Sequence, residues 1–385
     1  MPDTITATGP GRIRAINLNA VLRYIRKHGA TPRSSLIPAL KLSAAAVSAV
    51  TNELLSNGLL RIAAPVAGSD MAIRGRPKSP LELNPDVASA IGLRLHPFDD
   101  QCRIQVAWID YAGNITHLKP HYFDNFLEVS GVIDAIKVAL ASAAIAVPDI
   151  NTIRAATIAV PGVAAQNEIL MAPTLKAIEG KGFHLAISQQ ACYPISLTND
   201  VNLAVRSELH AQPRLSQQSF SYLYIGSGVG AGIGLQGKLW TGNGWAGEVG
   251  HLRIARNAGS TTSFEEILRT DTAFTDEIEY LGLAMDDLNG LANADINGNA
   301  RISAVLDDYA QALFELVQVL SSVLGLDEVI IDFPSSSLLS RLFPRIQASI
   351  ATQSLQVKIS SPANGDDAAV RGAAIEALDI SIEQL

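Results

Sequence analysis

The side chains best suited to hold a polar small molecule lie in two short segments of this 385-residue chain. Asn199 and Asp200 follow the apolar run Pro194–Leu197, which places an amide and a carboxylate at the end of an expected strand. Glu248 and His251 lie three residues apart among glycines. A lone Asp or His is usually structural, but together these groups offer the donors and acceptors that sugar hydroxyls need. We therefore expect them to line a polyol-binding cleft.

The segment Gly226–Gly232 is the most glycine-dense part of the chain, with four glycines in seven residues. Bare N–H groups in such a segment can approach a phosphate or another anion. We expect a strand to follow, whereas a dinucleotide fingerprint leads into a helix and a P-loop ends in Gly-Lys-Ser/Thr. An anion-binding loop and a tight hairpin in a crowded sheet are equal alternatives on this evidence.

These segments belong to an α/β pattern that occurs twice. The first unit has expected strands at Ala88–His96, Arg103–Asp110 and Ile115–Phe123. A helix at Val132–Ala146 and a further strand at Ile153–Ala159 follow. The second has strands at Phe220–Ile225, Gly230–Leu235 and from Lys238, helices at Ser263–Tyr280 and Ile302–Leu324, and a strand at Glu328–Phe333. The repetition predicts an internally duplicated, two-lobed body with a cleft between the lobes.

The first 85 residues have a different pattern. Apolar spacing predicts helices over Ile16–His28, around Leu36–Leu40 and over Ala44–Ser56, with Ser43 as the N-cap of the third. Strands are expected from Leu59 and over Pro80–Leu83, on either side of a polar tip that contains Arg74, Arg76 and Lys78. Three helices followed by a two-stranded ribbon indicate a winged helix-turn-helix.

Charge separates this N-terminal part, the head, from the body. Residues 1–85 hold eleven basic and four acidic side chains, whereas the whole chain has a net charge of −8. A basic head on an acidic body favours DNA binding over a helical capping domain. From Leu42 to Leu60 there is no Lys or Arg. Phosphate contacts are therefore expected from Arg12, Arg14, Arg33, Arg74, Arg76 and Lys78, and base contacts from Ser43, Ser48, Thr51 and Asn52.

Cysteine usage and hydropathy point to the cytoplasm. Cys102 and Cys192 are too far apart in sequence to indicate a disulfide framework or a metal cluster. The N-terminus has no apolar signal region, and Asp134 and Lys137 interrupt the most apolar stretch, Val132–Val147. We expect no membrane partner.

In this order, the motifs resemble those of the ROK family, which groups bacterial sugar kinases with sugar-responsive repressors. The matching segments are Val160–Val163, Thr198–Asp200, Gly226–Gly232 and Gly247–His251, and the head is similar to that of the repressor branch. The resemblance implies that Asn199 and Asp200 hold sugar hydroxyls and that Glu248 and His251 contact the sugar near its anomeric end. It also implies that Glu265 is the last sugar-binding glutamate and that Gly162 lies close to the ring.

The departures from the family pattern are informative. The kinases carry an Asp-x-Gly-Gly-Thr phosphate loop on the first strand, where this chain has Ile91–His96. Near the C-terminus, the family has a Gly-Gly pair after a strand, on the adenosine side of the nucleotide site. In this chain Asp332-Phe333-Pro334 follows Val329–Ile331 instead. Three zinc-binding cysteines of the family have no counterpart in Asn257–Ser263. The family's recognition helix usually carries Lys and Arg where this one has Ala44 and Ala49. We therefore expect no enzyme activity, no cofactor and no metal.

The sequence thus predicts a winged helix-turn-helix over residues 1–85 and an actin-like, sugar-kinase-like α/β body over residues 86–385. Lobe one is expected to span about 86–197 plus 366–385, and lobe two about 198–365. The predicted function is a sugar-responsive repressor, a dimer or tetramer whose partners are operator DNA and a sugar or sugar phosphate. One alternative is an ATP-dependent sugar kinase with an appended head. Another is a regulator that has lost sugar binding, which the retained site residues disfavour.

Overall fold

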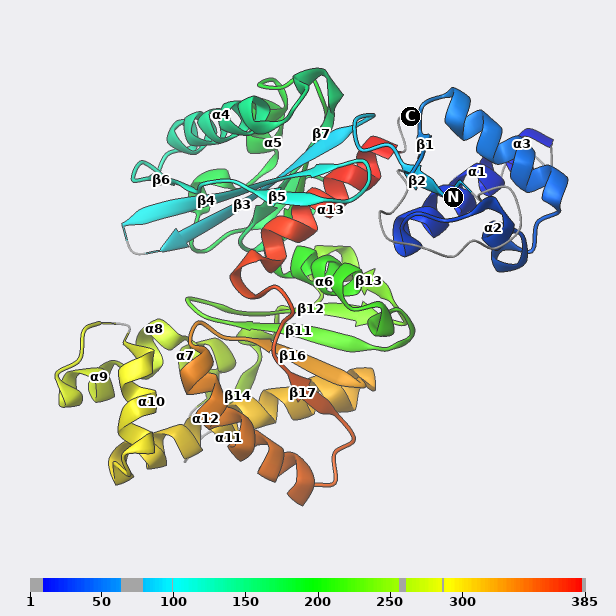
Figure 1. The fold of residues 1–385 in the computed structure, drawn as a ribbon. Helices are drawn as coiled ribbons and strands as arrows, with labels where there is room; N and C mark the ends of the chain where they lie inside the picture. Colours follow the sequence, from blue (N-terminus) through cyan, green and yellow to red (C-terminus); the bar gives the residue numbers. More distant parts are fainter. Residues whose placement is uncertain (1–9, 64–78, 99, 256–260, 286, 383–385) are drawn as a thin grey trace.

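The computed structural model describes residues 10–63, 79–98, 100–255, 261–285 and 287–382, with side chains from residue 13 onward. Two sheets, one above the other in Figure 1, form the body, and the helical head packs beside the upper sheet. The mixed α/β class and the duplicated body predicted from the sequence are both confirmed.

The head contains the predicted elements. Its helices are α1 (Pro10–His28), α2 (Arg33–Leu40) and α3 (Ala44–Ser56), and its antiparallel strands are β1 (Leu60–Ile62) and β2 (Leu81–Leu83). Lys41 ends α2 in a left-handed conformation, and the Ser43 side chain accepts a hydrogen bond from the Ala46 N–H at 3.1 Å. This cap confirms the predicted start of α3.

Lobe one is built on a mixed sheet in the order β10-β7-β3-β4-β5, with β6 also paired to β4. Its strands are β3 (Ser89–Phe98), β4 (Gln101–Asp110), β5 (Ile115–His117), β6 (His121–Phe123), β7 (Ile153–Val160) and β10 (Ile195–Asn199). Helices α4 (Val129–Ala146) and α5 (Lys181–Ser188) cover one face, where Ile91, Leu93 and Leu95 are buried. A small hairpin, β8 (Val163–Ala165) and β9 (Glu168–Met171), follows β7.

Lobe two has a five-stranded sheet in the order β13-β12-β11-β16-β17. Its strands are β11 (Phe220–Ile225), β12 (Val229–Leu235), β13 (Lys238–Trp240), β16 (Glu328–Asp332) and β17 (Lys358–Ser360). Its outer face packs on α11 (Ala300–Leu324) and α12 (Ser336–Thr352), with α10 (Leu288–Ile296) alongside. The two sheets repeat one pairing pattern, and this repeat is the duplication. In lobe one β3 pairs antiparallel with β4 and parallel with β7, and in lobe two β11 pairs antiparallel with β12 and parallel with β16.

Two predicted elements are interrupted in the structure. The expected strand Ile115–Phe123 is divided into β5 and β6, because Pro120 has no N–H to donate to β4. The expected helix Ser263–Tyr280 is three helices, α7 (Phe264–Leu268), α8 (Thr270–Ala273) and α9 (Thr275–Leu281). Arg269 is extended there, and the next N–H, of Thr270, donates to the carbonyl of Gly226 at 3.0 Å. This bond fixes the segment to the glycine-rich turn.

Helices α6 (Asp200–Ala211) and α13 (Ala368–Ile382) lie between the two sheets (Figure 1). Their close approach depends on glycine, because a Cβ on Gly372 of α13 would lie 1.8 Å from the Leu203 carbonyl of α6. On the other side of α13, a Cβ on Gly92 of β3 would lie 2.4 Å from the Ala374 nitrogen. Small residues therefore let α13 pack tightly against both lobes.

We expect Gly372→Ala to lower the free energy of unfolding by about 1–3 kcal/mol, because the added methyl group must push the two helices apart. Gly182→Ala is the matched control, since a Cβ at that position of α5 has no neighbour within 4 Å. Urea denaturation followed by circular dichroism measures both variants. Equal stability of the Gly372 variant and the control would contradict the described helix contact.

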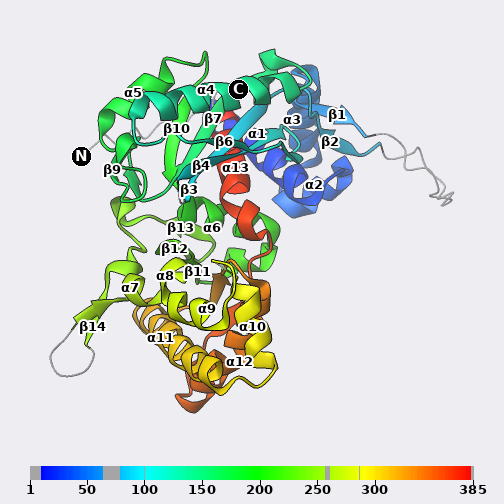
Figure 2. The ribbon, with the colours of Figure 1, turned by 90° about the vertical axis from the view of Figure 1, so that its left-hand side faces the viewer.

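The head shares a hydrophobic core with lobe one. Val21 and Ile25 of α1 belong to the same buried cluster as Ala90 of β3 and Ala374 of α13. The Arg26 guanidinium lies 5.5 Å from the centre of the Tyr111 ring, in the turn after β4. Figures 1 and 2 show α1–α3 beside the lobe-one sheet and one end of α13. The head is thus fixed to the body by side-chain packing as well as by the chain connection.

Helix α4 is the one described helix with the length and mean hydropathy, 1.7, to cross a membrane by these measures alone. It carries Asp134 and Lys137, which form an ion pair at 3.0 Å, and it buries Val132 and Ile136 against the lobe-one sheet. A core helix of a globular protein has the same properties.

Candidate functional site

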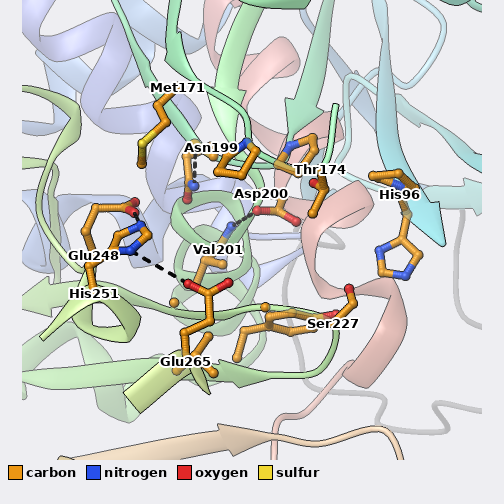
Figure 3. A pocket seen from close by; sticks show the side chains of 18 residues that line it. His96, Met171, Thr174, Asn199, Asp200, Val201, Ser227, Glu248, His251 and Glu265 are labelled. Atoms are coloured by element: carbon orange, nitrogen blue, oxygen red, sulfur yellow. Dashed lines mark hydrogen bonds and ion pairs between the residues drawn. The ribbon is translucent and has the colours of Figure 1, made fainter. Parts of the chain in front are cut away.

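The structure brings the six predicted sugar-binding residues together. Gly162, Asn199, Asp200, Glu248, His251 and Glu265 all line one pocket between the lobes (Figure 3). In this view Glu248 and His251 lie at one end, Asp200 in the middle, and His96 and Ser227 at the other end. Residues far apart in sequence therefore converge on a single cavity.

Gly162 and Asn199 form the lobe-one side of the pocket. Gly162 has a φ of +103°, and a Cβ there would lie 2.1 Å from the Met171 carbonyl. The Asn199 amide donates to the Gly162 carbonyl at 2.8 Å, and its oxygen caps α6 by accepting from the Asn202 N–H at 2.8 Å. Both ends of the Asn199 side chain thus have protein partners, so this residue fixes the turn on which Asp200 lies.

Glu248, His251 and Glu265 form the opposite wall. The two imidazole nitrogens of His251 lie 3.6 Å from a Glu248 oxygen and 3.8 Å from a Glu265 oxygen. Burial raises the pKa of Glu248. The carboxylates of Asp200 and Glu265 act in the same direction, and His251 acts against them. Glu265 is held in place because Ser263 starts its helix with a capping box. The wall offers carboxylate oxygens to hydroxyl donors.

Asp200, the first residue of α6, is the most buried carboxylate of the pocket. One oxygen accepts a hydrogen bond from the Val201 N–H at 2.9 Å, and the other lies 3.5 Å from the Arg94 guanidinium. Arg94 is also buried and comes from β3 of lobe one. Burial raises the pKa of Asp200, while the Arg94 charge and the Val201 hydrogen bond act against that rise.

Several lining residues were not predicted to bind sugar. They include Met171 and Thr174 around the β9 end, Ser227 in the glycine turn, and His96 of β3. Burial and the charges of Arg94 and Arg103 lower the pKa of His96 to about 3, so its ring is neutral. Met171 and Thr174 stand in no motif, so only the fold could reveal them. The glycine segment is a tight β11–β12 hairpin and also lines the pocket.

The structure corrects one predicted DNA contact. Thr51 is fully buried, and its hydroxyl donates to the Val47 carbonyl at 2.7 Å, so it stabilises α3 from inside. Helical periodicity places the Thr51 side chain on the core face of α3, whereas the next residue, Asn52, is exposed. Ser43 and Ser48 are exposed on the same helix. These three residues, Ser43, Ser48 and Asn52, keep the predicted contact surface.

Two of the predicted cations already have partners in the head. Arg14 makes a paired contact with Glu53 of α3, with bonds of 2.9 and 2.7 Å, and Arg33 donates to Asn52 at 2.8 Å. Both arginines thus border α3. The side chains of Arg12, Arg74, Arg76 and Lys78 lie outside the described residues.

Within the described ranges, no group of three His, Cys, Asp or Glu side chains is arranged to hold a metal ion. His251 faces two carboxylates, and residues 256–260 of the segment that corresponds to the family's cysteines are not described. Cys102 is buried in β4 of lobe one. Residues 257–263 contain no cysteine, so the residues present do not fit the family's zinc site.

Comparison with known proteins agrees with this architecture. The xylose repressor of Caldicellulosiruptor bescii is 28% identical over 251 residues, which are 63% of this chain and 59% of the repressor. The N-acetylmannosamine kinase of Vibrio vulnificus strain YJ016 is 27% identical over 50% of this chain and 68% of the kinase. The chain spans about three fifths of the length of the xylose repressors that it matches.

Solved structures show the same fold. A ROK family transcriptional regulator, described as a homologue of the Escherichia coli MLC protein, covers 96% of both chains with a TM-score of 0.77 and 20% identity. A ROK glucokinase from Streptomyces griseus, solved with glucose and AMPPNP, covers 76% of this chain and its own full length, with a TM-score of 0.61 and 20% identity. The ROK family pattern itself matches residues 127–380, and the chain belongs to the ROK family.

Proposed function

We propose that this chain is a cytoplasmic DNA-binding regulator that responds to a sugar, a repressor of carbohydrate-utilisation genes. The observation that carries the proposal is the convergence of Gly162, Asn199, Asp200, Glu248, His251 and Glu265 on one interlobe pocket. The same body carries a helix-turn-helix head on its lobe-one side. A ligand pocket and a DNA-binding element on one chain are the two parts that such a regulator needs.

In this proposal residues 1–85 bind operator DNA and residues 86–385 bind the sugar in two lobes, with the boundaries predicted from the sequence. Base edges meet exposed Ser43, Ser48 and Asn52, and phosphates meet Arg12, Arg14, Arg33, Arg74, Arg76 and Lys78. The chain acts as a dimer or tetramer, because helix-turn-helix regulators match their symmetry to that of the operator.

Phosphoryl transfer is the alternative, since N-acetylmannosamine kinases are also relatives and the family resemblance implies that Asp200 matches the kinases' catalytic base. Two departures from the kinase pattern, Arg94 and Asp332, meet beside Asp200 around one small cavity. In this chain a buried arginine contacts the carboxylate that a kinase would use to take a proton from the sugar. This contact favours a binding role for Asp200 over a catalytic one.

A physical route connects the pocket to the head. Asp200 begins α6, and Arg206 on the same helix lies 2.8 Å from Glu376 and 3.5 Å from Asp379 of α13. Helix α13 in turn shares the buried cluster with the head. A sugar that prefers one lobe arrangement over another would therefore move the head, whereas one with equal affinity for both would not.

The test of this function is calorimetry against monosaccharides and their phosphates, followed by operator titration with each sugar that binds. A hit should lower operator affinity. A sugar that binds at Asp200 and leaves operator affinity unchanged would remove the regulatory half of the proposal. Sugar-dependent nucleotide hydrolysis well above background would instead favour the kinase.

We expect a free monosaccharide to bind at least about tenfold more tightly than its phosphate. This ratio corresponds to a difference of about 1.4 kcal/mol in binding free energy. Among the described residues that line the pocket there are three carboxylates and no Lys or Arg. The positive charge of Arg94 behind the pocket is paired with Asp200 and Asp366. A phosphate would lie beside these carboxylates, and the described lining residues offer it no Lys or Arg partner. Tighter binding of the phosphorylated sugar would contradict this prediction.

A further inference from the structure

Asp200 belongs to two cavities at once. It lines the sugar pocket, and it also lines a much smaller space behind it, together with Arg94, Tyr222, Tyr224 and Asp332. The first cavity is the larger of the two, and the second is lined by these five polar side chains together with apolar and glycine residues. Asp200 is thus the point at which a ligand would meet this internal network.

Arg94 is the centre of that network. One terminal nitrogen lies 3.5 Å from an Asp200 oxygen, and the other donates to the side chain and the backbone carbonyl of Asp366, each at 3.1 Å. The same nitrogen donates to Gln105 at 3.3 Å, while Nε has no partner. The Arg94 side chain is only 5% exposed and that of Asp200 is 11% exposed, so water screens the charges of this pair weakly.

The network joins elements of both lobes. Arg94 and Gln105 come from β3 and β4 of lobe one, and Asp366 lies in the short 3-10 turn Gly365–Asp367 that precedes α13. Asp332 ends β16 of lobe two and accepts a hydrogen bond from the Tyr222 hydroxyl at 2.8 Å. Arg94 also lies 6.0 Å from the ring centre of Tyr224 in β11. The guanidinium therefore lies where the lobes and both central helices meet.

The contact between Arg94 and Asp200 is longer than a usual charge-assisted hydrogen bond of about 2.7–2.9 Å. The Asp200 oxygen is thus close enough to be stabilised by the positive charge and still has capacity for a hydroxyl donor. A buried carboxylate without such a charge would be protonated more readily and would lose acceptor strength. Arg94 offsets part of the effect of that burial on Asp200.

We propose that Arg94 is a positioning residue for the sugar site: it keeps Asp200 ionised and aimed at the pocket, so that the site selects hydroxyl donors. The inference rests on the proposed function and assigns a role to a side chain that does not itself line the sugar pocket. Through Asp366, the same guanidinium links Asp200 to the start of α13.

The test compares sugar affinity against pH for wild type, Arg94→Met and Arg94→Lys. At pH 7 Arg94→Met should bind at least about tenfold more weakly, and Arg94→Lys should keep part of the affinity. Loss of the positive charge raises the pKa of Asp200 further, so affinity of the Met variant should recover as pH rises. A loss that is equal at every pH would show a merely structural role and overturn the proposal.

Other charged or titratable groups surround Asp200 and influence its titration: Tyr224, Asp332, Asp366, Glu248, Glu265, His251 and His96. The informative quantity is therefore the ratio of variant to wild-type sugar affinity at each pH, because the effects of these surrounding groups are common to both proteins and largely cancel. Arg103→Met is the matched control, because Arg103 also pairs with Asp366, at 2.9 Å, from the neighbouring strand. It should leave the affinity within about twofold.

A second measurement does not need the sugar. Carbon-13 NMR of labelled aspartates, with the Asp200 signal identified by Asp200→Asn, follows the ionisation of Asp200 in wild type and in Arg94→Met. The pKa of Asp200 should be higher in the variant, and an unchanged value would refute the inference even if sugar binds. A wild-type protein that binds no sugar would refute the proposed function, and with it the assignment of Arg94 to a sugar site.

Discussion

Asp200→Ala should reduce sugar affinity at least about a hundredfold and leave operator binding without sugar unchanged. Hydrogen bonds to a charged group contribute about 1.5–3 kcal/mol each, and a buried carboxylate can accept more than one sugar hydroxyl. The residue lines the pocket at the start of α6 and does not belong to α3, whose exposed face is proposed to meet DNA. Calorimetry with a bound sugar and fluorescence anisotropy with labelled operator measure the two affinities.

The alanine variant also leaves Arg94 with fewer partners in a buried place, which can weaken the fold. Asp200→Asn keeps the volume and one acceptor oxygen, so it separates loss of sugar binding from loss of structure. Asp134→Ala removes an equal charge from the exposed surface of α4 and is the control. Unchanged sugar binding by both Asp200 variants would mean that the sugar binds elsewhere.

Arg74→Ala combined with Arg76→Ala should weaken binding to operator and to random DNA to a similar degree. The described recognition helix carries no cation, so phosphate contacts must supply most of the affinity. Each lost phosphate contact lowers the slope of log affinity against log salt by about 0.9, so the double variant should lose nearly 2 units of slope. Titration at several salt concentrations measures this slope.

The control for the double variant removes two exposed cations from the body, Arg154 and Lys238. It should keep both the affinity and the salt slope of the wild type. Operator binding that is unchanged in the Arg74/Arg76 variant would show that the polar tip does not contact the phosphate backbone, and the wing assignment would be wrong.

Local signals were sufficient to predict much of the fold. Apolar spacing and a capping serine located α3, and apolar runs located the strands of both sheets except β17, which was not predicted. The predictions failed where distant contacts decide the conformation. Arg269 interrupts an expected helix because the following N–H bonds to Gly226, which is more than forty residues away in sequence. Thr51 was misassigned because its type allows DNA contact but its position faces the core.

The pocket shows the same division. The sequence and the resemblance identified six residues that the fold brings together, and their sugar contacts stay predictions. Neither identified Arg94 as their buried neighbour, because its partners Asp200 and Asp366 are more than a hundred residues away in sequence. In the sequence, Arg94 stands out only as part of a departure from the kinase pattern. Long-range ion pairs leave no local periodicity to detect.

The buried cluster common to Val21, Ile25, Ala90 and Ala374 limits how such a protein can be re-engineered or can evolve by recombination. A chimera that joins this head to another effector domain would expose α1 side chains that are buried here, unless the new domain offered equally small residues beneath them. Operator preference should therefore change more readily by substitutions on the exposed face of α3 than by exchange of whole heads. The head is an integral subdomain rather than a transferable cassette.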